Sequence, residues 1–275
     1  MGRKIDKIDT VKILVLGDIV GQPGCRAVFG SLQSLLKETR ADLVVANGEN
    51  ATEGLGITPE AAEGLFKSGI DVITSGNHIW QRKEILPLLE KDNRILRPEN
   101  YPTGVPGTGH YLVTKKEVPI GVVNLQGRVN MSSIRCPFTV GEALFRRLGK
   151  SAKVIVVDFH AELPEEKEAL ALYFDGKISA LVGTHTHVQT ADEKILPGGT
   201  AYITDTGMTG PLSGVIGMKR DISIRRSLMQ IPFKMEVEDS AAVVMGVLLT
   251  VSVGSGKALS IERIRRDLPD LSSSG

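Results

Sequence analysis

Five short polar blocks, each directly after a short apolar run, gather side chains that could bind a metal ion. Four of the five histidines are in these blocks, beside carboxylate and carboxamide side chains. Imidazole, carboxylate and carboxamide groups together suit borderline divalent ions such as Mn, Fe, Zn or Co. Because the blocks contain no thiolate, a structural zinc site is disfavoured. The blocks are Asp18 and residues 47–50, 76–78, 158–160 and 184–187.

The candidate ligands outnumber the positions around one metal ion. They are Asp18, Glu49, Asn50, Asn77, His160, His185 and His187. A tetrahedral ion takes four ligands, so the set is large enough for two ions. A carboxylate shared between the ions, most simply Glu49, would hold them about 3.5–4 Å apart, the spacing found in enzymes that hydrolyse phosphoesters. This arrangement predicts in-line attack on phosphorus by a metal-bridging hydroxide, with His78 as the candidate acid that protonates the leaving oxygen.

Each candidate also has a purely structural interpretation. Asp18 could cap the turn after its strand, and Glu49 with Asn50 could be turn residues. A lone histidine is usually a core or surface residue, and His110 is left in that class. Two histidines two positions apart after a strand point to the same side, and with His160 they form a metal-binding face. We therefore take the ligand interpretation for the whole set.

Three further side chains are placed near the site without binding a metal. Asn47 is expected to be a turn residue or to support a ligand, and Asp205 to line the pocket. Arg128 follows a predicted strand, where it could clamp a phosphate or could simply be a solvated arginine.

Alternating strands and helices must bring the polar blocks together. Apolar runs at 11–17, 43–46, 72–74, 154–157, 178–182 and 201–204 predict buried strands. Helices are predicted over 26–39, from the cap at Thr58 and Pro59 to about Gly69, and over 164–174. Residues 21–24 are predicted to turn the chain, and 241–251 and 258–264 to form antiparallel strands. This alternation of strands and helices predicts a largely parallel central sheet. Ligands bind at the carboxyl ends of the strands in such a sheet.

Residues 92–140 differ in character from the segments around them. Three prolines and several glycines and asparagines occupy 93–109, and hairpin strands are predicted over 111–114 and 120–124. We expect residues 1–275 to form a single domain, with 92–140 as a cap-like insertion beside the active edge. A long surface loop is the alternative for this segment.

Composition excludes several classes of protein. The 33 basic and 32 acidic residues nearly cancel, and basic and aromatic residues are not interleaved, which argues against direct nucleic-acid binding. No apolar stretch has the length of a membrane span. Cys25 and Cys136 lie far apart, which predicts free thiols in a reducing compartment. Residues 1–12 are charged and lack an apolar signal core, so a cytoplasmic location is expected.

The order and type of the blocks resemble those of the calcineurin-like metallophosphoesterases. That family's blocks run Asp-x-His, Gly-Asp-x-x-Asp, Gly-Asn-His-acid, a lone His and Gly-His-x-His. The corresponding stretches here are 17–20, 48–50, 76–79, His160 and 183–187. The resemblance covers residues 13 to about 210. It implies an α/β sandwich of two mixed β-sheets flanked by helices, with a small cap-like insertion.

Three departures from the common pattern point to one branch of that family. Val20 stands where the pattern has a histidine ligand, and Ile79 stands where an acid should follow His78. Glu49 replaces an aspartate and is followed directly by Asn50. These variants are similar to the bacterial YmdB-type branch, whose members hydrolyse phosphodiesters, cyclic nucleotides included, at a di-metal and often di-iron centre.

The resemblance to this branch implies two divalent or trivalent metal ions per chain, iron first, with manganese or zinc as alternatives. One ion would be held by Asp18, Glu49, Asn50 and His187, and the other by Glu49, Asn77, His160 and His185. His78 would be the general acid. The implied substrates are small phosphodiesters, namely 2′,3′- or 3′,5′-cyclic nucleotides. The alternatives are a phosphomonoesterase or nuclease of the same family, or a metal-bound regulatory protein with little turnover. Homo-oligomerisation is left open.

Overall fold

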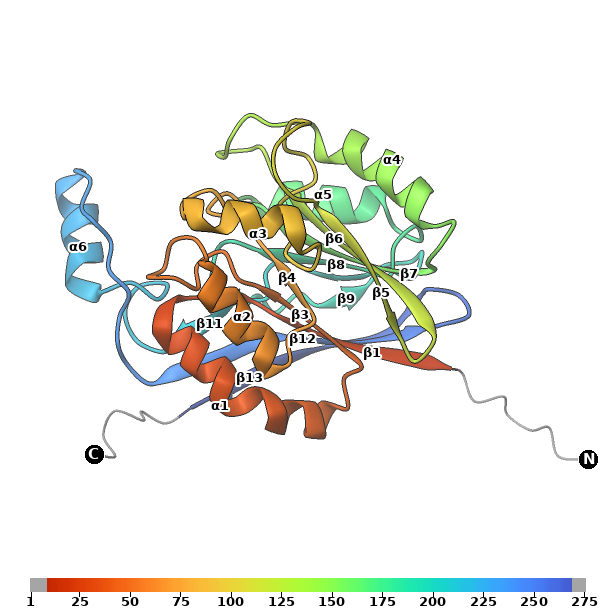
Figure 1. Ribbon diagram of the computed structural model, residues 1–275, viewed down its shortest axis with the longest axis horizontal. Coiled ribbons are helices and arrows are strands. Elements are labelled where there is room, and N and C mark those ends of the chain that lie inside the picture. Colours follow the sequence, from red (N-terminus) through yellow and green to blue (C-terminus); the bar gives the residue numbers. More distant parts are fainter. Residues whose placement is uncertain (1–8, 269–275) are drawn as a thin grey trace, which may run out of the picture.

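The computed structural model describes residues 9–268 as two β-sheets packed face to face with helices outside them (Figure 1). Within residues 9–268, no helix has both the length and the apolar character needed to cross a membrane. Most of the charged segment 1–12, on which the expected location was based, lies outside the described residues.

The first sheet has seven strands. They are β1 (Thr10–Leu16), β2 (Asp18–Ile19), β3 (Leu43–Asn47), β4 (Val72–Thr74), β11 (Met208–Pro211), β12 (Ala242–Ser252) and β13 (Ala258–Asp267). Their order is β2-β11-β12-β1-β3-β4, and β13 also pairs with β12. β1, β3 and β4 are parallel, whereas β12 runs antiparallel to β1 and to β13. The predicted antiparallel pair near the C-terminus is thus confirmed.

The second sheet has six strands in the order β5-β6-β7-β8-β10-β9. They are β5 (His110–Lys115), β6 (Val118–Gln126), β7 (Val154–His160), β8 (Ala180–Thr184), β9 (Lys194–Ile195) and β10 (Ala201–Ile203). The four central strands are parallel and the two outer pairings are antiparallel. The parallel strands therefore divide between two mixed sheets and do not form one central sheet. The architecture implied by the family resemblance, two mixed sheets flanked by helices, is confirmed.

All of the α-helices but the last cover the outer faces of the two sheets (Figure 1). The helices are α1 (Gly21–Thr39), α2 (Pro59–Ser68), α3 (Leu86–Lys91) after the 3-10 turn η1 (Lys83–Ile85), α4 (Pro137–Leu148), α5 (Pro164–Tyr173) and α6 (Arg220–Met229). α1 and α2 pack on the first sheet, and α4 and α5 pack on the second. α6 projects away from the body of the protein in Figure 1.

The turn predicted over residues 21–24 is wrong, because α1 already begins at Gly21. Pro23 lies in the first helical turn, where its missing N–H leaves no helical hydrogen bond unmade. Gly24 makes the first bond of the helix, donating its N–H to the Val20 carbonyl at 3.1 Å.

Side-chain alternation decides which residues of the second sheet face the first. In β7, Ile155 and Val157 pack against the helices, while Val154 and Val156 pack in the core between the sheets. Because successive strand residues point to opposite faces, the later even-numbered residues of β7 continue this inner face. The same alternation holds in β6, whose residues pair with those of β7 in parallel register.

The segment predicted to be a cap-like insertion contributes two strands to the second sheet. The predicted hairpin is confirmed, because β5 and β6 pair in antiparallel register. The rest of the segment forms a loop before β5, a loop after β6 and the start of α4. One loop is tied to the end of β6, since Asn100 donates its Nδ2–H to the Gln126 carbonyl at 2.7 Å. A capping role for these loops stays a prediction.

Gly246 allows β1 and β12 to approach closely. A Cβ atom on Gly246 would lie 2.2 Å from the Val15 carbonyl oxygen.

We expect Gly246→Ala to lower the free energy of unfolding by about 1–3 kcal/mol, because the sheet must shift to relieve the clash. Gly30→Ala in α1 is the control, because nothing lies within 4 Å of its Cβ position, and it should raise that free energy by about 0.5–1 kcal/mol. Urea unfolding measures both; equal changes would contradict the close approach.

Candidate metal centre

The predicted ligands meet where parallel strands of both sheets end. They are Asp18 at the start of β2, Glu49 and Asn50 after β3, Asn77 after β4, His160 at the end of β7, and His185 and His187 after β8. His78 follows Asn77 in the same turn. The structure brings these side chains together, as their positions at strand ends predict.

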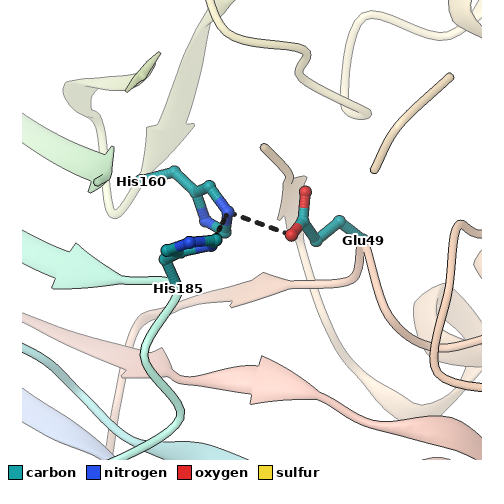
Figure 2. Close-up of side chains that lie close together, drawn as sticks. All are labelled: Glu49, His160 and His185. Atoms are coloured by element: carbon teal, nitrogen blue, oxygen red, sulfur yellow. Dashed lines mark hydrogen bonds and ion pairs between the residues drawn. The ribbon is translucent and has the colours of Figure 1, made fainter. Parts of the chain in front are cut away.

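Four of the side chains surround one small volume. His160 Nε2 lies 3.0 Å from Glu49 Oε1 and 3.0 Å from His185 Nδ1. Asn77 Oδ1 lies 3.1 Å from the same nitrogen of His160. Figure 2 shows the carboxylate of Glu49 and the two imidazole rings facing one another. The ligand atoms of Glu49, His160 and His185 all lie within 4.8 Å of one another.

Hydrogen bonds behind His160 fix which ring nitrogen faces this volume. Thr184 donates its hydroxyl to Asp158 Oδ1 at 2.7 Å. The Thr184 oxygen is then left to accept the Nδ1–H of His160 at 2.9 Å. With its proton on Nδ1, the neutral ring directs its Nε2 lone pair at Glu49. Burial lowers the pKa of His160 to about 4, which keeps the ring neutral at pH 7.

His185 is oriented by Glu162, so its lone pair also faces the volume. His185 Nε2 donates to Glu162 Oε2 at 2.9 Å, which leaves an unprotonated Nδ1 facing His160. Glu49 Oε1 is buried and has no hydrogen-bond donor among the residues described. Two lone pairs and a carboxylate oxygen thus converge without a proton between them. A cation would stabilise this arrangement, so the donor set fits a metal ion.

Asp18, Asn50 and His187 form a second group beside the first. Asn50 Nδ2 lies 3.2 Å from His187 Nε2 and 3.4 Å from Asp18 Oδ1. His187 donates its Nδ1–H to the Ile216 carbonyl at 2.9 Å, so its Nε2 lone pair faces the group. The Asn50 oxygen lies 2.7 Å from His78 Nδ1. The carboxamide must therefore rotate by half a turn before its oxygen can bind an ion here. Burial raises the pKa of Asp18. Such a rise is typical of a buried carboxyl group that has no cation nearby.

His78 lies at the open side of the group. Its side chain is 28% exposed, whereas that of Glu49 is fully buried. The backbone N–H of His78 donates to Glu49 Oε2 at 2.9 Å, and its Nδ1 lies 3.4 Å from Glu49 Oε1. Burial lowers the pKa of His78, and the charge of Glu49 opposes that change. His78 therefore combines contact with the buried carboxylate and access to solvent.

Asp158 is a site residue that the sequence analysis did not assign. It is buried, and it accepts hydrogen bonds from Asn47 at 3.2 Å, from Thr184 at 2.7 Å and from the Thr74 hydroxyl. Asn47 and Thr74 belong to the first sheet and Thr184 to the second, so the carboxylate joins the sheets. Burial raises its pKa to about 7. The signal in the sequence is its spacing of two from His160, which places both on one face of β7.

A buried ion pair supports the loop that carries His185 and His187. Lys167 Nζ lies 2.9 Å from Asp205 Oδ2 and donates to the Thr184 carbonyl at 2.9 Å. Asp205 also accepts a hydrogen bond from a backbone N–H of the loop. His185 and His187 have φ values of 102° and 65°, a region that L residues seldom adopt. Asp205, predicted to line the pocket, is instead fully buried and helps to hold this strained loop.

The two cysteines are free, as predicted; Cys25 is buried and Cys136 is partly buried. The exposed guanidinium of Arg128 directs Nη2 at Cys136 Sγ, 3.4 Å away. A phosphate-binding role for Arg128 stays a prediction.

Comparison with known proteins identifies relatives of the whole chain. The YmdB-like protein family matches residues 14–264. A 2′,3′-cyclic-nucleotide 2′-phosphodiesterase from Bacillus subtilis (strain 168) is 42% identical over 254 residues, which is 92% of this chain and 96% of the relative. A phosphatase from Mycoplasma pneumoniae has a crystal structure with TM-score 0.90 and 34% identity, covering 97% and 96% of the two chains. A putative 5′-nucleotidase from Staphylococcus aureus shares the fold at TM-score 0.61 and 16% identity, covering 97% of this chain and 55% of that one.

The buried, neutral His160 is expected to make the stability of the metal-free protein depend on pH. Its folded-state pKa of about 4 lies below the usual 6.5. Between these values the unfolded chain binds a proton that the folded chain does not. The contribution of His160 is thus fully present above pH 6.5 and is lost as pH falls toward 4. Urea unfolding with a chelator across this window should therefore show a shallower rise with pH for His160→Gln than for the unsubstituted protein.

The pH profile of His160→Gln must be compared with that of the unsubstituted protein, because Asp158 changes the free energy of unfolding with pH in the opposite direction to His160. Its pKa is raised from 3.8 to about 7, so its contribution is present below 3.8 and is lost as pH rises through 7. Parallel pH profiles for the two proteins would contradict the assignment to His160.

Proposed function

The chain belongs to the YmdB-like family, and from this premise and the site geometry we propose that it is a metal-dependent phosphodiesterase acting on small phosphodiesters. Family membership, with relatives named phosphodiesterase and phosphatase, makes the chain a phosphoester hydrolase. The observation that carries the metal dependence is the buried Glu49 Oε1, which has no donor among the described residues and faces two imidazole lone pairs. The name of the Bacillus relative favours 2′,3′-cyclic nucleotides as the first substrates to test, ahead of 3′,5′-cyclic nucleotides.

Two groups of side chains would each hold one metal ion. One group is Glu49, Asn77, His160 and His185, and the other is Asp18, Asn50 and His187 with Glu49 shared. The mixed nitrogen and oxygen donors suit borderline ions such as Mn, Fe, Zn or Co, and the family resemblance puts iron first, with manganese or zinc as alternatives. When bound, such ions supply a water of lowered pKa as the nucleophile and neutralise charge on the phosphoryl oxygens.

The residues of the chain supply position and a proton. Thr184 and Glu162 keep the lone pairs of His160 and His185 directed inward. Hydrolysis of a 2′,3′-cyclic nucleotide at the 2′ position breaks the bond from phosphorus to O2′, and that alkoxide needs a proton. We assign this donation to His78, and its partial exposure and its contact with the carboxylate of Glu49 support the assignment.

Metal content and activity should be lost together when a ligand is removed. Purified protein is expected to contain two metal ions per chain and to hydrolyse bis(p-nitrophenyl) phosphate and 2′,3′-cyclic nucleotides. Asn77→Ala and His185→Ala should lower the metal content, measured by atomic emission, and reduce turnover by more than about a hundredfold. His110→Ala is the control, because His110 contacts Glu99 and Thr108 outside the site. It should retain metal and activity.

Two outcomes would count against the proposal. Hydrolysis of p-nitrophenyl phosphate with no activity on the diester would indicate a phosphomonoesterase. Bound metal without turnover of either ester would indicate a regulatory protein.

Replacing His78 should affect substrates according to their leaving groups. His78→Ala is expected to slow hydrolysis of 2′,3′-cyclic nucleotides by about a hundredfold or more, because their alkoxide leaving group needs a proton. The slowing of bis(p-nitrophenyl) phosphate should be less than about tenfold, because p-nitrophenolate leaves without one. Initial rates measured on protein of unchanged metal content test this. Equal slowing of both substrates would contradict the role of His78 as an acid.

A further inference from the structure

Three side chains beside the metal centre have no part in the mechanism above: Trp80, Tyr101 and Gln126. Trp80 lies two positions after His78, and Tyr101 lies in the loop tied to the end of β6. The rings of Trp80 and Tyr101 pack edge to face, with centroids 5.2 Å apart. Burial raises the pKa of Tyr101; the side chain of Trp80 opposes that effect, and the nearby charge of Glu49 adds to it. The aromatic pair is thus a neighbour of the metal ligands.

Gln126 lies on the face of β6 that looks toward the site. It is paired in register with His160 of β7 and is completely buried. Residues paired in this way on parallel strands direct their side chains to the same face. Tyr101 donates its hydroxyl to Gln126 Oε1 at 3.2 Å, which orients the carboxamide.

Two buried N–H donors of this cluster lack a hydrogen-bond partner within residues 9–268. Among the described residues, neither Gln126 Nε2 nor Trp80 Nε1 has a hydrogen-bond acceptor, although both atoms are buried. A buried donor left unpaired destabilises a protein by about 1–3 kcal/mol, so such atoms usually have a partner. The indole N–H can only donate, so the missing partner is an acceptor.

We propose that Trp80, Tyr101 and Gln126 form a subsite for the nucleoside part of the substrate, an inference that rests on the proposed function. The aromatic pair supplies an apolar wall for the base. The unpaired N–H groups donate to neutral acceptors of the nucleoside, such as a base carbonyl. Neutral donors suit a neutral acceptor, whereas phosphate is usually bound by charged groups. The competing assignment is that the same donors bind a phosphoryl oxygen.

Trp80 reports directly on this subsite, because it is the single tryptophan of the chain. Uridine 3′-monophosphate, the product expected from a 2′,3′-cyclic nucleotide, should change the tryptophan fluorescence in a saturable way. Inorganic phosphate at the same concentrations should leave it nearly unchanged. Gln126→Leu keeps the size of the side chain but removes its amide, and it should weaken nucleotide binding by about tenfold. Gln33→Leu, at an exposed position of α1, is the matched control and should bind normally.

Kinetics separate the two assignments independently. Gln126→Leu should raise KM for 2′,3′-cyclic nucleotides by about tenfold, while hydrolysis of bis(p-nitrophenyl) phosphate changes by less than about twofold. Equal losses on both substrates, equal fluorescence responses to phosphate and nucleotide, or no response to nucleotide would each overturn the subsite. A wild-type protein that hydrolyses no phosphodiester would instead refute the proposed function, and the fluorescence titration would still decide whether the subsite binds a nucleotide.

Discussion

The site depends on one buried carboxylate that fixes the two sheets relative to each other. Asp158 of β7 accepts hydrogen bonds from Asn47 and Thr74 of the first sheet and from Thr184 of its own sheet. These hydrogen bonds specify the position of the sheets more narrowly than apolar contacts do, because hydrogen bonds tolerate little displacement. Since Glu49 comes from the first sheet and His160 from the second, this position decides whether their ligand atoms meet.

The same network makes the site unfavourable without a cation. Because Thr184 uses its proton on Asp158, His160 must present a lone pair to Glu49. Glu49 Oε1 thereby faces imidazole lone pairs that cannot donate to it, and burial raises the pKa of the Glu49 carboxyl group. A metal ion removes this penalty, so its binding free energy adds directly to the stability of the fold. The strained loop of His185 and His187 is held in advance by the Lys167–Asp205 pair, which limits the reorganisation that binding requires.

The sequence predicts those features that depend on neighbours along the chain. Buried parallel strands are uniformly apolar, so the change to polar residues at Asp18, Asn77 or His185 marks where each strand ends. Features that depend on distant partners are not predictable in this way. The three donors to Asp158 come from three different strands, and Lys167 lies 38 residues from Asp205. The position of Gln126 also depends on a distant partner, because only the pairing of β6 with β7 places Gln126 beside the site. Local chemistry misled once, when the glycines and proline of residues 21–24 suggested a turn.

The position of β12 sets the order in which this protein can be completed during synthesis. β1 is among the first segments to leave the ribosome, yet its antiparallel partner β12 comes from residues 242–252. Asp18 likewise pairs with Met208 of β11, which is made late. A nascent chain therefore carries an unpaired apolar strand edge for most of its translation, a surface that invites aggregation or a chaperone. The support around Asp18 is therefore complete only after β11 and β12 have been made, so a product truncated before them would lack these strand pairings.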